Sequence, residues 1–383
     1  MLMLPRRRFL ASGGLAAGGL LLPGCATTTA GRGGAGGCLP PVEVSAARVI
    51  RTVAGLRPYR ASGFVVRAEA LGDKRLVHNY GHGGAGITLS WGSSRLATQL
   101  GLQGQSGPVA VIGAGVMGLT TARLVQEAGF PVTLYTEALT PQTTSNIAGG
   151  QISPFGHFSE EEVTPEWRAQ FAAAMDYSWR RFQIMVGDDY GIRWLPTYQE
   201  RDSGGPPRPS PYHPDARALT PAEHPFPVEH LVRYDTMYVE VGRFLRELTR
   251  DVQIAGGRIE VRRFGAPGEI AALPERLVFN CTGLGSRELF GDKALHPVRG
   301  QLAILLPQPE VRYAFQGRAG YMFPRADGIL LGGTFEQDEW DAVPRPADIE
   351  RIVASHKELF EGFRCSSPEL NASRRRPGSS SAV

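Results

Sequence analysis

The residues whose spacing most directly suggests chemistry form a glycine-rich turn, Gly113–Gly118, with the pattern GxGxxG. It follows the apolar run Val109–Ile112 and opens a segment of helical character, the context that a dinucleotide-binding turn requires. Gly113 permits the tight turn, Gly115 lets the backbone approach a pyrophosphate, and Gly118 lets the helix pack closely on the strand. N–H groups at the helix start, around Val116 and Met117, favour phosphate. The pattern predicts a dinucleotide site but does not separate NAD from FAD.

Further polar and small residues follow this turn. Glu137 stands about 20 residues beyond Gly118, after the strand Val132–Tyr135, where a carboxylate can accept the ribose hydroxyls. The segment Thr140–Gly150 then carries hydroxyls and ends in small residues. Hydroxyls can bond phosphate oxygens, and small residues let the backbone lie against a flat ring. We therefore add a group of candidates: Thr143, Thr144, Ala148, Gly149 and Gly150. A plain polar loop is the alternative.

A second glycine-rich segment, His78–Gly86, leads into an expected helix from Ile87. Consecutive backbone N–H groups at a helix start form another anion site. Two such cradles in one chain predict a single long dinucleotide held at two points. We interpret His78 and His82 as core or surface histidines of a glycine turn, because no carboxylate or cysteine stands at ligand spacing and no metal site is expected.

The elements expected around these motifs alternate between strands and helices, as in a βαβ unit. An amphipathic helix is expected near the C-terminus, and residues 202–215, rich in Pro, Gly and Ser, are expected to form a surface loop. The expected strands are Ala61–Ala70, Arg75–Asn79, Val109–Ile112, Val132–Tyr135, Arg258–Arg262 and Leu277–Asn280. The expected helices are Ile87–Leu100, Val116–Ala128 and Ala347–Phe360.

The first residues are interpreted as an export signal. Arg6–Leu10 fits a twin-arginine pattern and precedes an apolar run too short to span a bilayer. Leu22–Cys25 resembles a lipoprotein box, with Cys25 as the lipidated residue. We expect an exported protein of the periplasm or cell envelope, with membrane contact through that anchor. The alternative is a buried or membrane-spanning N-terminal helix, which its glycines disfavour.

The charge and cysteine content of the chain argue against a nucleic-acid partner and a metal site. The net charge of the 383 residues is +4, and we find no clustering of basic residues typical of a nucleic-acid interface. Cys38, Cys281 and Cys365 are widely spaced and form no CxxC pair, so the sequence indicates no metal site, while one disulfide is compatible with export. The sequence does not predict the oligomeric state.

Several motifs together resemble the D-amino-acid oxidase family of FAD-dependent oxidoreductases. They cover nearly all of the chain from Val42 to Cys365, although the family places the first two at the C-terminal end of its chains. Because they precede the Rossmann strand here, the sequence resembles a circular permutation, which is tolerated where old termini meet. The matching segments are Gly55–Arg60, Val77–Thr88 with Trp91-Gly92, Thr143-Thr144 with Ala148–Gly150, Asn280–Gly283, Arg299–Gln301 and Gly332–Phe335.

The resemblance implies a reaction and roles for individual residues. A D-amino acid would be oxidised at its Cα–N bond, with release of a 2-oxo acid, ammonia and hydrogen peroxide. Arg57 would bind the substrate carboxylate as a bidentate fork, Tyr321 would meet the same carboxylate, and the backbone of Gly84 would contact the amine. No side chain would need to act as a base. The resemblance also implies FAD contacts from Gly83, Gly84, Gly86, Ile87, Thr88 and Thr282.

Some features depart from the family pattern. The segment between the strand Arg299–Leu306 and Tyr321 is short, so we expect a reduced active-site lid without a second tyrosine. Ser153 stands where many members carry a polar amide. Arg318 or His157 would favour an acidic substrate such as D-aspartate if either reached the site, but we expect both to be solvated surface charges. Tyr313 and Phe315 are interpreted as packing residues.

The expected fold is α/β, a Rossmann-like FAD-binding domain with a second α+β substrate domain built on a mixed or antiparallel sheet. The alternatives in function are an NAD(P)-dependent dehydrogenase on a Rossmann fold and a non-catalytic lipoprotein that keeps the flavin fold. The expected ranges are a signal peptide 1–24, a flexible tether 25–41, a permuted FAD- and substrate-binding segment 42–100, a Rossmann core 108–155, the first part of the substrate domain 156–250, a return to the FAD-binding domain 251–300, the second part of the substrate domain 301–345, a helix 346–365 and a disordered tail 366–383.

Overall fold

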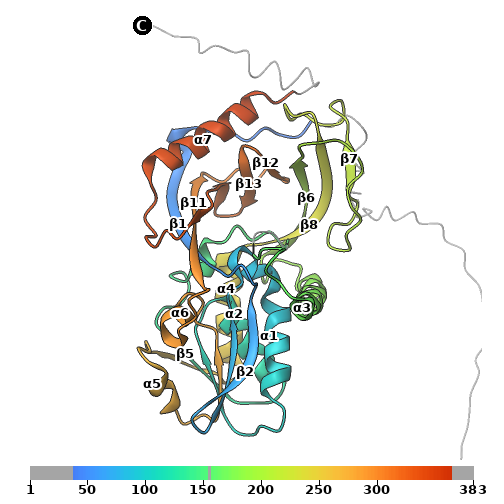
Figure 1. The fold of residues 1–383 in the computed structure, drawn as a ribbon. Helices are drawn as coiled ribbons and strands as arrows, with labels where there is room; N and C mark the ends of the chain where they lie inside the picture. Colours follow the sequence, from blue (N-terminus) through green and yellow to red (C-terminus); the bar gives the residue numbers. More distant parts are fainter. Residues whose placement is uncertain (1–37, 154–156, 365–383) are drawn as a thin grey trace, which may run out of the picture. The chain divides into compact units, whose positions relative to one another are not determined.

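The computed structural model describes residues 38–153 and 157–364. They contain two sheets with helices packed on them (Figure 1). Fifteen strands are present in this part of the chain: β1 Val49–Tyr59, β2 Val65–Leu71, β3 Lys74–Tyr80, β4 Val109–Ile112, β5 Val132–Thr136, β6 Ile192–Glu200, β7 Arg217–Leu219, β8 Leu231–Val239, β9 Arg258–Val261, β10 Leu277–Asn280, β11 His296–Leu305, β12 Ala314–Gly317, β13 Gly320–Arg325, β14 Gly328–Gly332 and β15 Glu336–Gln337.

Seven α-helices and three short 3-10 helices connect these strands. The α-helices are α1 Gly86–Gly101, α2 Val116–Glu127, α3 Pro165–Ile184, α4 Val241–Ile254, α5 Pro267–Ala271, α6 Gly285–Phe290 and α7 Pro346–Glu361. The 3-10 helices are η1 Ala46–Arg48, η2 Gly83–Ala85 and η3 Thr144–Ile147.

The first sheet has six strands in the order β2-β3-β10-β4-β5-β9. All neighbours pair in parallel except β2 and β3, which form an antiparallel hairpin. The carboxyl ends of β3, β10, β4 and β5 therefore meet at one edge. In open α/β sheets this edge is where ligands bind.

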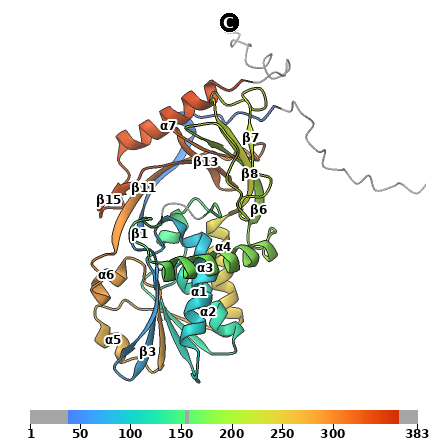
Figure 2. The same cartoon turned by 45° about the vertical axis from the view of Figure 1, so that its right-hand side comes forward.

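The short central strands β4, β5 and β10 are buried on both faces, which explains why they are mostly apolar without alternation. Val109 and Val111 of β4 face the helices α1, α2 and α4, while Ala110 and Ile112 face α5 and α6. Helices α1, α2 and α4 lie side by side on one face in both views (Figures 1 and 2). The amphipathic pattern of α4 fits this position, because its buried residues recur every three or four positions: Val241, Phe244, Leu245, Leu248 and Val252.

The second sheet has nine strands, in the order β1-β11-β14-β13-β12-β6-β8-β7 with β15 also paired to β11. It is mixed, because the pairing of β12 with β6 is parallel and the other pairs are antiparallel. Helix α7 lies across one face (Figure 1), where Ile352 and Phe360 pack with Met322 and Leu331. Because α7 covers one face of this sheet, the opposite face is left for the site.

These observations confirm the expected α/β class and the mixed second sheet. The strands at Val109–Ile112 and Leu277–Asn280 have the expected bounds. The strand expected at Ala61–Ala70 begins only at Val65, because residues 61–64 form a turn in which Gly63 has φ +78°. The expected domain ranges stay a prediction, although two of them meet within β11 and the range 42–100 supplies strands to both sheets.

The expected tether 25–41 ends earlier than the sequence suggested. Leu39 packs on the nine-stranded sheet, and the Tyr313 hydroxyl donates to the carbonyl oxygen of Pro40 at 2.7 Å. Cys38 is disulfide-bonded. The predicted signal peptide, Cys25 and the tail 366–383 also lie outside the described residues. Within residues 38–153 and 157–364, no helix is long and apolar enough to cross a membrane.

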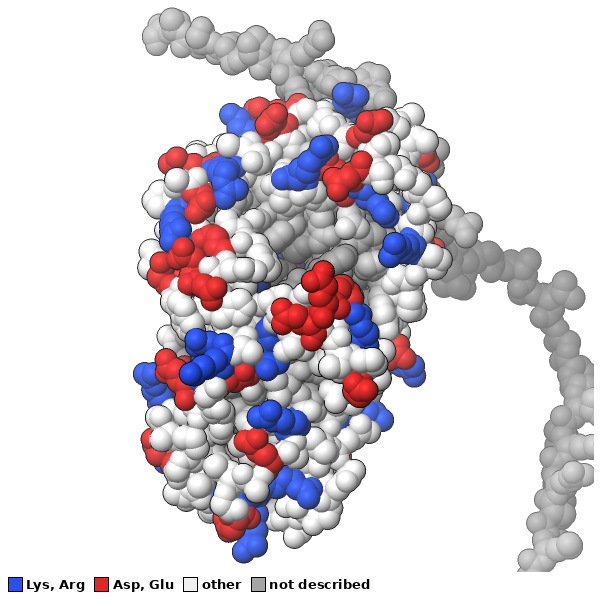
Figure 3. Space-filling view, viewed as in Figure 1, with Lys and Arg blue, Asp and Glu red and all other residues white. Residues whose placement is uncertain are grey.

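Charged side chains are mixed on the molecular face drawn in Figure 3. Lysine and arginine side chains alternate with those of aspartate and glutamate over this face. Exposed ion pairs in the described part of the chain include Arg180 with Asp176 and Arg217 with Glu223. Such exposed pairs contribute little to stability, at most about 1 kcal/mol each.

Candidate active site

A cavity of about 680 Å³ joins the carboxyl edge of the six-stranded sheet to the open face of the nine-stranded sheet. This volume lies within the range of about 300–1,000 Å³ typical of small-molecule sites. The six-stranded sheet contributes residues that follow β3, β4, β5, β9 and β10. The nine-stranded sheet contributes residues of β1, β11, β12 and β13.

The turn after β4 is shaped by the absence of side chains. Gly113 has φ +104°, and a Cβ atom there would lie 2.4 Å from the carbonyl oxygen of Cys281. The N–H of Val116 at the start of α2 donates to Ser145 Oγ at 3.0 Å. Gly113, Gly115, Val116 and Met117 line the cavity, as expected for phosphate-binding residues. Gly118 does not line it, because it packs behind the turn, where a Cβ atom would lie 1.7 Å from the carbonyl oxygen of Gly113.

The second glycine segment reaches the same cavity from β3. Gly81 and Gly83 have φ +85° and +52°, which turns the chain into η2 and then α1. The cavity-lining residues of this segment are Tyr80, Gly81, His82, Gly83, Gly84, Gly86 and Ile87. Thr88 lies behind the wall, where its hydroxyl contacts the carbonyl oxygens of Gln151 and Ser153. The structure thus brings two glycine turns, far apart in sequence, to one cavity.

The two histidines of this segment, for which core and surface positions were both open, are buried. His82 Nε2 lies 2.9 Å from Ser93 Oγ, and the His82 ring stacks on Phe64. Burial, with a smaller contribution from His157, lowers the pKa of His82 to about 3, so this ring is neutral at physiological pH. Among the described residues no cluster of three or more His, Cys, Asp or Glu side chains is placed to hold a metal ion.

The remaining dinucleotide candidates also line the cavity: Glu137, Thr143, Thr144, Ala148, Gly149, Gly150 and Thr282. Glu137 is two-thirds exposed, and its carboxylate lies 3.6 Å from Arg263 Nε. The Thr143 hydroxyl donates to Asn146 at 2.8 Å, and the Thr282 hydroxyl donates to Asn280 at 2.8 Å. Both hydroxyls therefore keep oxygen lone pairs but already use their proton locally.

The substrate end is formed by two side chains that lie over glycines. Arg57 belongs to β1, and a Cβ atom on Gly300 of the neighbouring β11 would lie 2.2 Å from Arg57 Nη2. Tyr321 belongs to β13, and a Cβ atom on Gly332 of the neighbouring β14 would lie 2.3 Å from Tyr321 Cζ. Since β14 pairs with β11, the arginine and the tyrosine approach each other across the two glycine-bearing strands. Both side chains line the cavity.

Arg57 is oriented by a segment that follows β14. Its Nη1 donates to the carbonyl oxygen of Thr334 at 3.2 Å. That segment is fastened to β11, because the N–H of Gln301 donates to Thr334 Oγ1 at 3.1 Å and Glu336 pairs with Arg299 in the β11–β15 ladder. The guanidinium therefore depends on the loop 332–336 for its position.

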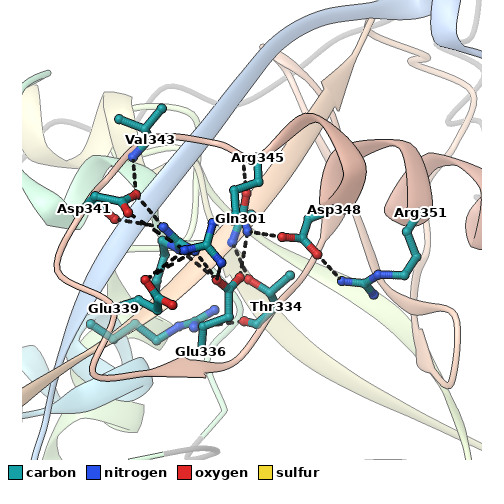
Figure 4. Close-up of polar contacts among 11 residues, drawn as sticks. Gln301, Thr334, Glu336, Glu339, Asp341, Val343, Arg345, Asp348 and Arg351 are labelled. Carbon is teal, nitrogen blue, oxygen red and sulfur yellow. Dashed lines mark hydrogen bonds and ion pairs between the residues drawn. The ribbon is translucent and has the colours of Figure 1, made fainter.

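A polar cluster that includes Gln301, Glu336 and Asp341 holds this loop (Figure 4). The fully buried Arg299 belongs to the same cluster. Arg299 Nε donates to Glu336 at 2.9 Å, and its other nitrogens contact Glu336 and Asp341. Gln301 Nε2 donates to Glu336 at 2.7 Å and to Asp348 of α7 at 2.8 Å. Burial opposes ionisation of Glu336, but bonds from Thr334, Gln301 and Arg299 keep its pKa below the usual value. Removing the arginine would leave these carboxylates close together without their shared counterion.

Two hydrogen bonds to Asp292 join the ends of β1 and β3. The Asp292 carboxylate accepts from Arg60 Nε at 2.8 Å and from the Tyr80 hydroxyl at 2.8 Å. Burial would raise the pKa of Asp292, but the bonds from Tyr80 and Arg60 hold it below its usual value. These hydrogen bonds hold the segment that carries Arg57 beside the segment that carries Gly83 and Gly84.

Other expectations are corrected or refined by the structure. Tyr313 and Phe315 are core residues, as predicted. Arg318 is exposed and paired with Glu200, whereas His157 is buried among aromatic rings and is not the solvated charge that we expected. Neither lines the cavity. Strands β12 and β13 are joined by the two-residue turn Arg318-Ala319, consistent with the expected reduction of the lid.

Sequence reasoning missed several residues that line the cavity. They are Gln151, Gln316 and Phe323 near Tyr321, Phe335 in the loop beside Arg57, and Arg262 and Arg263 after β9. The alternation along a strand could have found Phe323, which lies two positions after Tyr321 and thus on the same face. Gln316 could not be found this way, since its pairing with Tyr321 depends on the turn between them.

The sequence was also compared with family models and with known proteins. The family model "FAD dependent oxidoreductase" (DAO) matches residues 33–100 and 108–378. A D-amino-acid oxidase of Streptomyces coelicolor is 31% identical over 271 residues, covering 67% of this chain and 79% of that protein. A D-aspartate oxidase of Homo sapiens is 29% identical over 258 residues, covering 64% and 74%.

A solved structure shows a similar fold. The glycine oxidase from Bacillus cereus ATCC 14579 has a TM-score of 0.50 and 15% sequence identity, covering 68% of this chain and 81% of that chain. At this identity the likeness concerns the fold alone. The family match extends over most of the chain, and it includes both glycine turns and the strands that bear Arg57 and Tyr321. The chain therefore belongs to the D-amino-acid oxidase family of FAD-dependent oxidoreductases, and FAD is its cofactor.

Proposed function

We propose that this enzyme oxidises a D-amino acid at its Cα–N bond to an imine, which water hydrolyses to a 2-oxo acid and ammonia, while dioxygen accepts the two electrons and becomes hydrogen peroxide. The observation that carries the proposal is the convergence of Arg57 and Tyr321 on the cavity that both glycine turns also reach. Relatives named D-amino-acid oxidase and D-aspartate oxidase support the same reaction class.

The residues present fit FAD. The backbone of Gly113 lies where any side chain would collide with Cys281, and the glycines 83, 84 and 86 present bare backbone to the cavity. Gly149 and Gly150 likewise present no side chain to it. When bound at these glycines, FAD would supply the two-electron redox chemistry.

The chain itself binds and orients the amino acid. The planar fork of Arg57 suits a carboxylate, because two parallel N–H bonds fix both the position and the plane of the ligand. The Tyr321 hydroxyl can donate a third bond to the same group. The backbone of Gly84 can then meet the amine. If the amine binds in its neutral form, orienting it for the reaction requires no side chain acting as base.

The first test is turnover. We expect purified protein to be yellow and to release hydrogen peroxide and ammonia in equal amounts with D-amino acids, while the L-enantiomers give no signal. Peroxide is measured with a peroxidase-coupled dye, and ammonia is measured separately. Colourless protein that turns over only with NAD(P) would support the dehydrogenase alternative. Yellow protein without turnover of any amino acid would support the non-catalytic alternative.

The second test removes the guanidinium. Arg57→Ala should stay yellow but lose at least about 100-fold in kcat/KM, because two charge-assisted hydrogen bonds are each worth roughly 1.5–3 kcal/mol. Arg57→Lys should recover only part of this loss, since an ammonium lacks the planar fork. The matched control is Arg51→Ala, an exposed arginine on the same strand. Equal kinetics for Arg57→Ala and Arg51→Ala would exclude Arg57 from substrate binding.

We also propose that the chain order is a circular permutation of the family order. The family match falls into two blocks that meet at the exposed joint 101–107. The ends of the described part both contact Tyr313: its hydroxyl donates to Pro40, and its ring stacks on Phe363. Such proximity is what a reordered chain requires.

The test of this proposal is a rearranged chain. It starts at Val109, continues to Arg364, passes through a short Gly-Ser linker to Leu39 and ends at Gly104. We expect it to bind flavin and to melt within a few degrees of the natural order. A control opened between Ser93 and Ser94, inside α1, should not fold. If the two rearranged chains fail alike, the proposal is wrong.

Export as a lipoprotein remains a proposal. It rests on Arg6–Leu10 and Cys25 in the sequence, and the disulfide of Cys38 fits an oxidising compartment. We expect the double change Arg6→Lys with Arg7→Lys to retain the protein in the cytoplasm, because the twin-arginine pathway requires both arginines. Fractionation of cells followed by immunoblotting measures this. Unchanged export, matching the control Arg32→Lys, would contradict the assignment.

A further inference from the structure

The side chain next to Tyr321 on the cavity face is a glutamine. Gln316 of β12 is the cross-strand partner of Tyr321 of β13, and directly paired residues share a face of the sheet. Strand β12 lies one strand farther from β1 than β13 does. Gln316 thus continues the row that begins with Arg57 and passes through Tyr321, and it lies on the side away from the guanidinium.

Gln316 is held in an amide pair with Gln151. Gln316 Nε2 donates to Gln151 Oε1 at 2.5 Å, and Gln151 Nε2 donates to the Tyr238 hydroxyl at 2.8 Å. The Tyr238 hydroxyl lies 2.9 Å from Thr197 Oγ1. Both glutamines line the cavity and are only half-buried. Each primary amide has two N–H donors and two lone pairs on its oxygen, so both keep capacity for a ligand.

Among the described residues that line the cavity, none of those beside Gln151 and Gln316 is charged. Besides Arg57, the charged lining residues stand beyond the ends of β5 and β9 or on α6, at the dinucleotide end: Glu137, Arg262, Arg263 and Glu288. The cation nearest along the chain, Arg318, is exposed and paired with Glu200. Burial raises the pKa of Tyr238 and of Tyr234 above the ordinary value, so the phenols behind the amide pair are uncharged.

A cavity end lined by uncharged amides favours a neutral substrate side chain over an acidic one. With its α-carboxylate on Arg57 and Tyr321, a D-amino acid has its side chain free to extend past Tyr321 toward the amide pair. A second carboxylate there would lose water without gaining a counterion, which is costly. A carboxamide or hydroxyl can exchange its water bonds for bonds to Gln151 and Gln316. An aliphatic group of the same shape would leave the amides without those partners.

We infer that Gln151 and Gln316 form the subsite for the substrate side chain and select D-amino acids with a short neutral, hydrogen-bonding side chain over acidic ones. This inference rests on the proposed oxidase function. It names the class of substrate: a carboxamide or hydroxyl side chain of the size of asparagine or serine.

The test uses three side chains of nearly equal shape. D-asparagine, D-leucine and D-aspartate are compared by kcat/KM in the FAD-loaded enzyme. D-asparagine should exceed D-leucine by about 5- to 10-fold, the value of one or two neutral hydrogen bonds. It should exceed D-aspartate by at least about 100-fold. Equal or better turnover of D-aspartate would overturn the inference.

A binding measurement separates this inference from the reaction itself. Succinamate, 4-methylpentanoate and succinate are the same three molecules without the amine and cannot be oxidised by this route. Calorimetric Kd values on the FAD-loaded enzyme should follow the same order, with succinamate tightest. If this order holds while no D-amino acid is turned over, the subsite stands and the proposed function fails. If D-amino acids are oxidised without discrimination, the function stands and the subsite fails.

Variants then assign the selectivity to the amides. Gln316→Leu should lower the D-asparagine to D-leucine ratio about fivefold or more, and Gln316→Arg should raise the D-aspartate to D-asparagine ratio at least tenfold. Gln183→Leu, an exposed position on α3, is the control and should keep the natural ratios. The far-ultraviolet circular dichroism and the bound flavin check that each variant is folded. Unchanged ratios in folded Gln316 variants would remove Gln316 from the subsite.

Discussion

The contact of the Arg57 guanidinium with the backbone of Gly300 is the interaction on which the substrate end of this protein depends. An arginine on an edge strand can lie flat over the next strand only if that strand presents no side chain there. Gly300 provides the space, and the loop carbonyl of Thr334 provides the direction. Gly332 serves Tyr321 in the same way, so a pair of glycines on adjacent strands lets two long side chains approach each other.

This arrangement explains why a buried ionic cluster is maintained so close to the site. Burying Arg299 carries a large desolvation cost, which its carboxylate partners must offset. What the cluster fixes is the path of the chain from Gly332 to Glu336, and this path supplies the carbonyl that orients Arg57. On the other side, Asp292 fastens Arg60 to Tyr80 and thereby couples the substrate strand to the second glycine turn. The same hydrogen bonds therefore help to position both the cofactor end and the substrate end of the cavity.

The sequence predicted the local elements well where glycine pattern and apolar runs coincide. Gly113–Gly118 after a short apolar strand permits few alternatives, and residues that follow parallel strands must meet at one edge. Gly118 and Thr88 were assigned to the cofactor by motif, but they face away from the cavity, because a motif gives spacing and not the direction of each side chain. The strand register that places Gln316 beside Tyr321 comes from tertiary pairing, which no local pattern contains. The acceptor of Arg60, Asp292, lies too far along the chain for spacing to reveal it.

The two-residue connection between β12 and β13 has one more consequence. A hairpin turn this short has no slack, since both flanking residues, Gly317 and Gly320, are paired across the ladder. Mobile flaps over enzyme sites need a stretch of backbone that can swing on hinges. The β12–β13 hairpin has no such stretch, so this connection cannot act as a swinging cover over the neighbouring Tyr321 and Gln316.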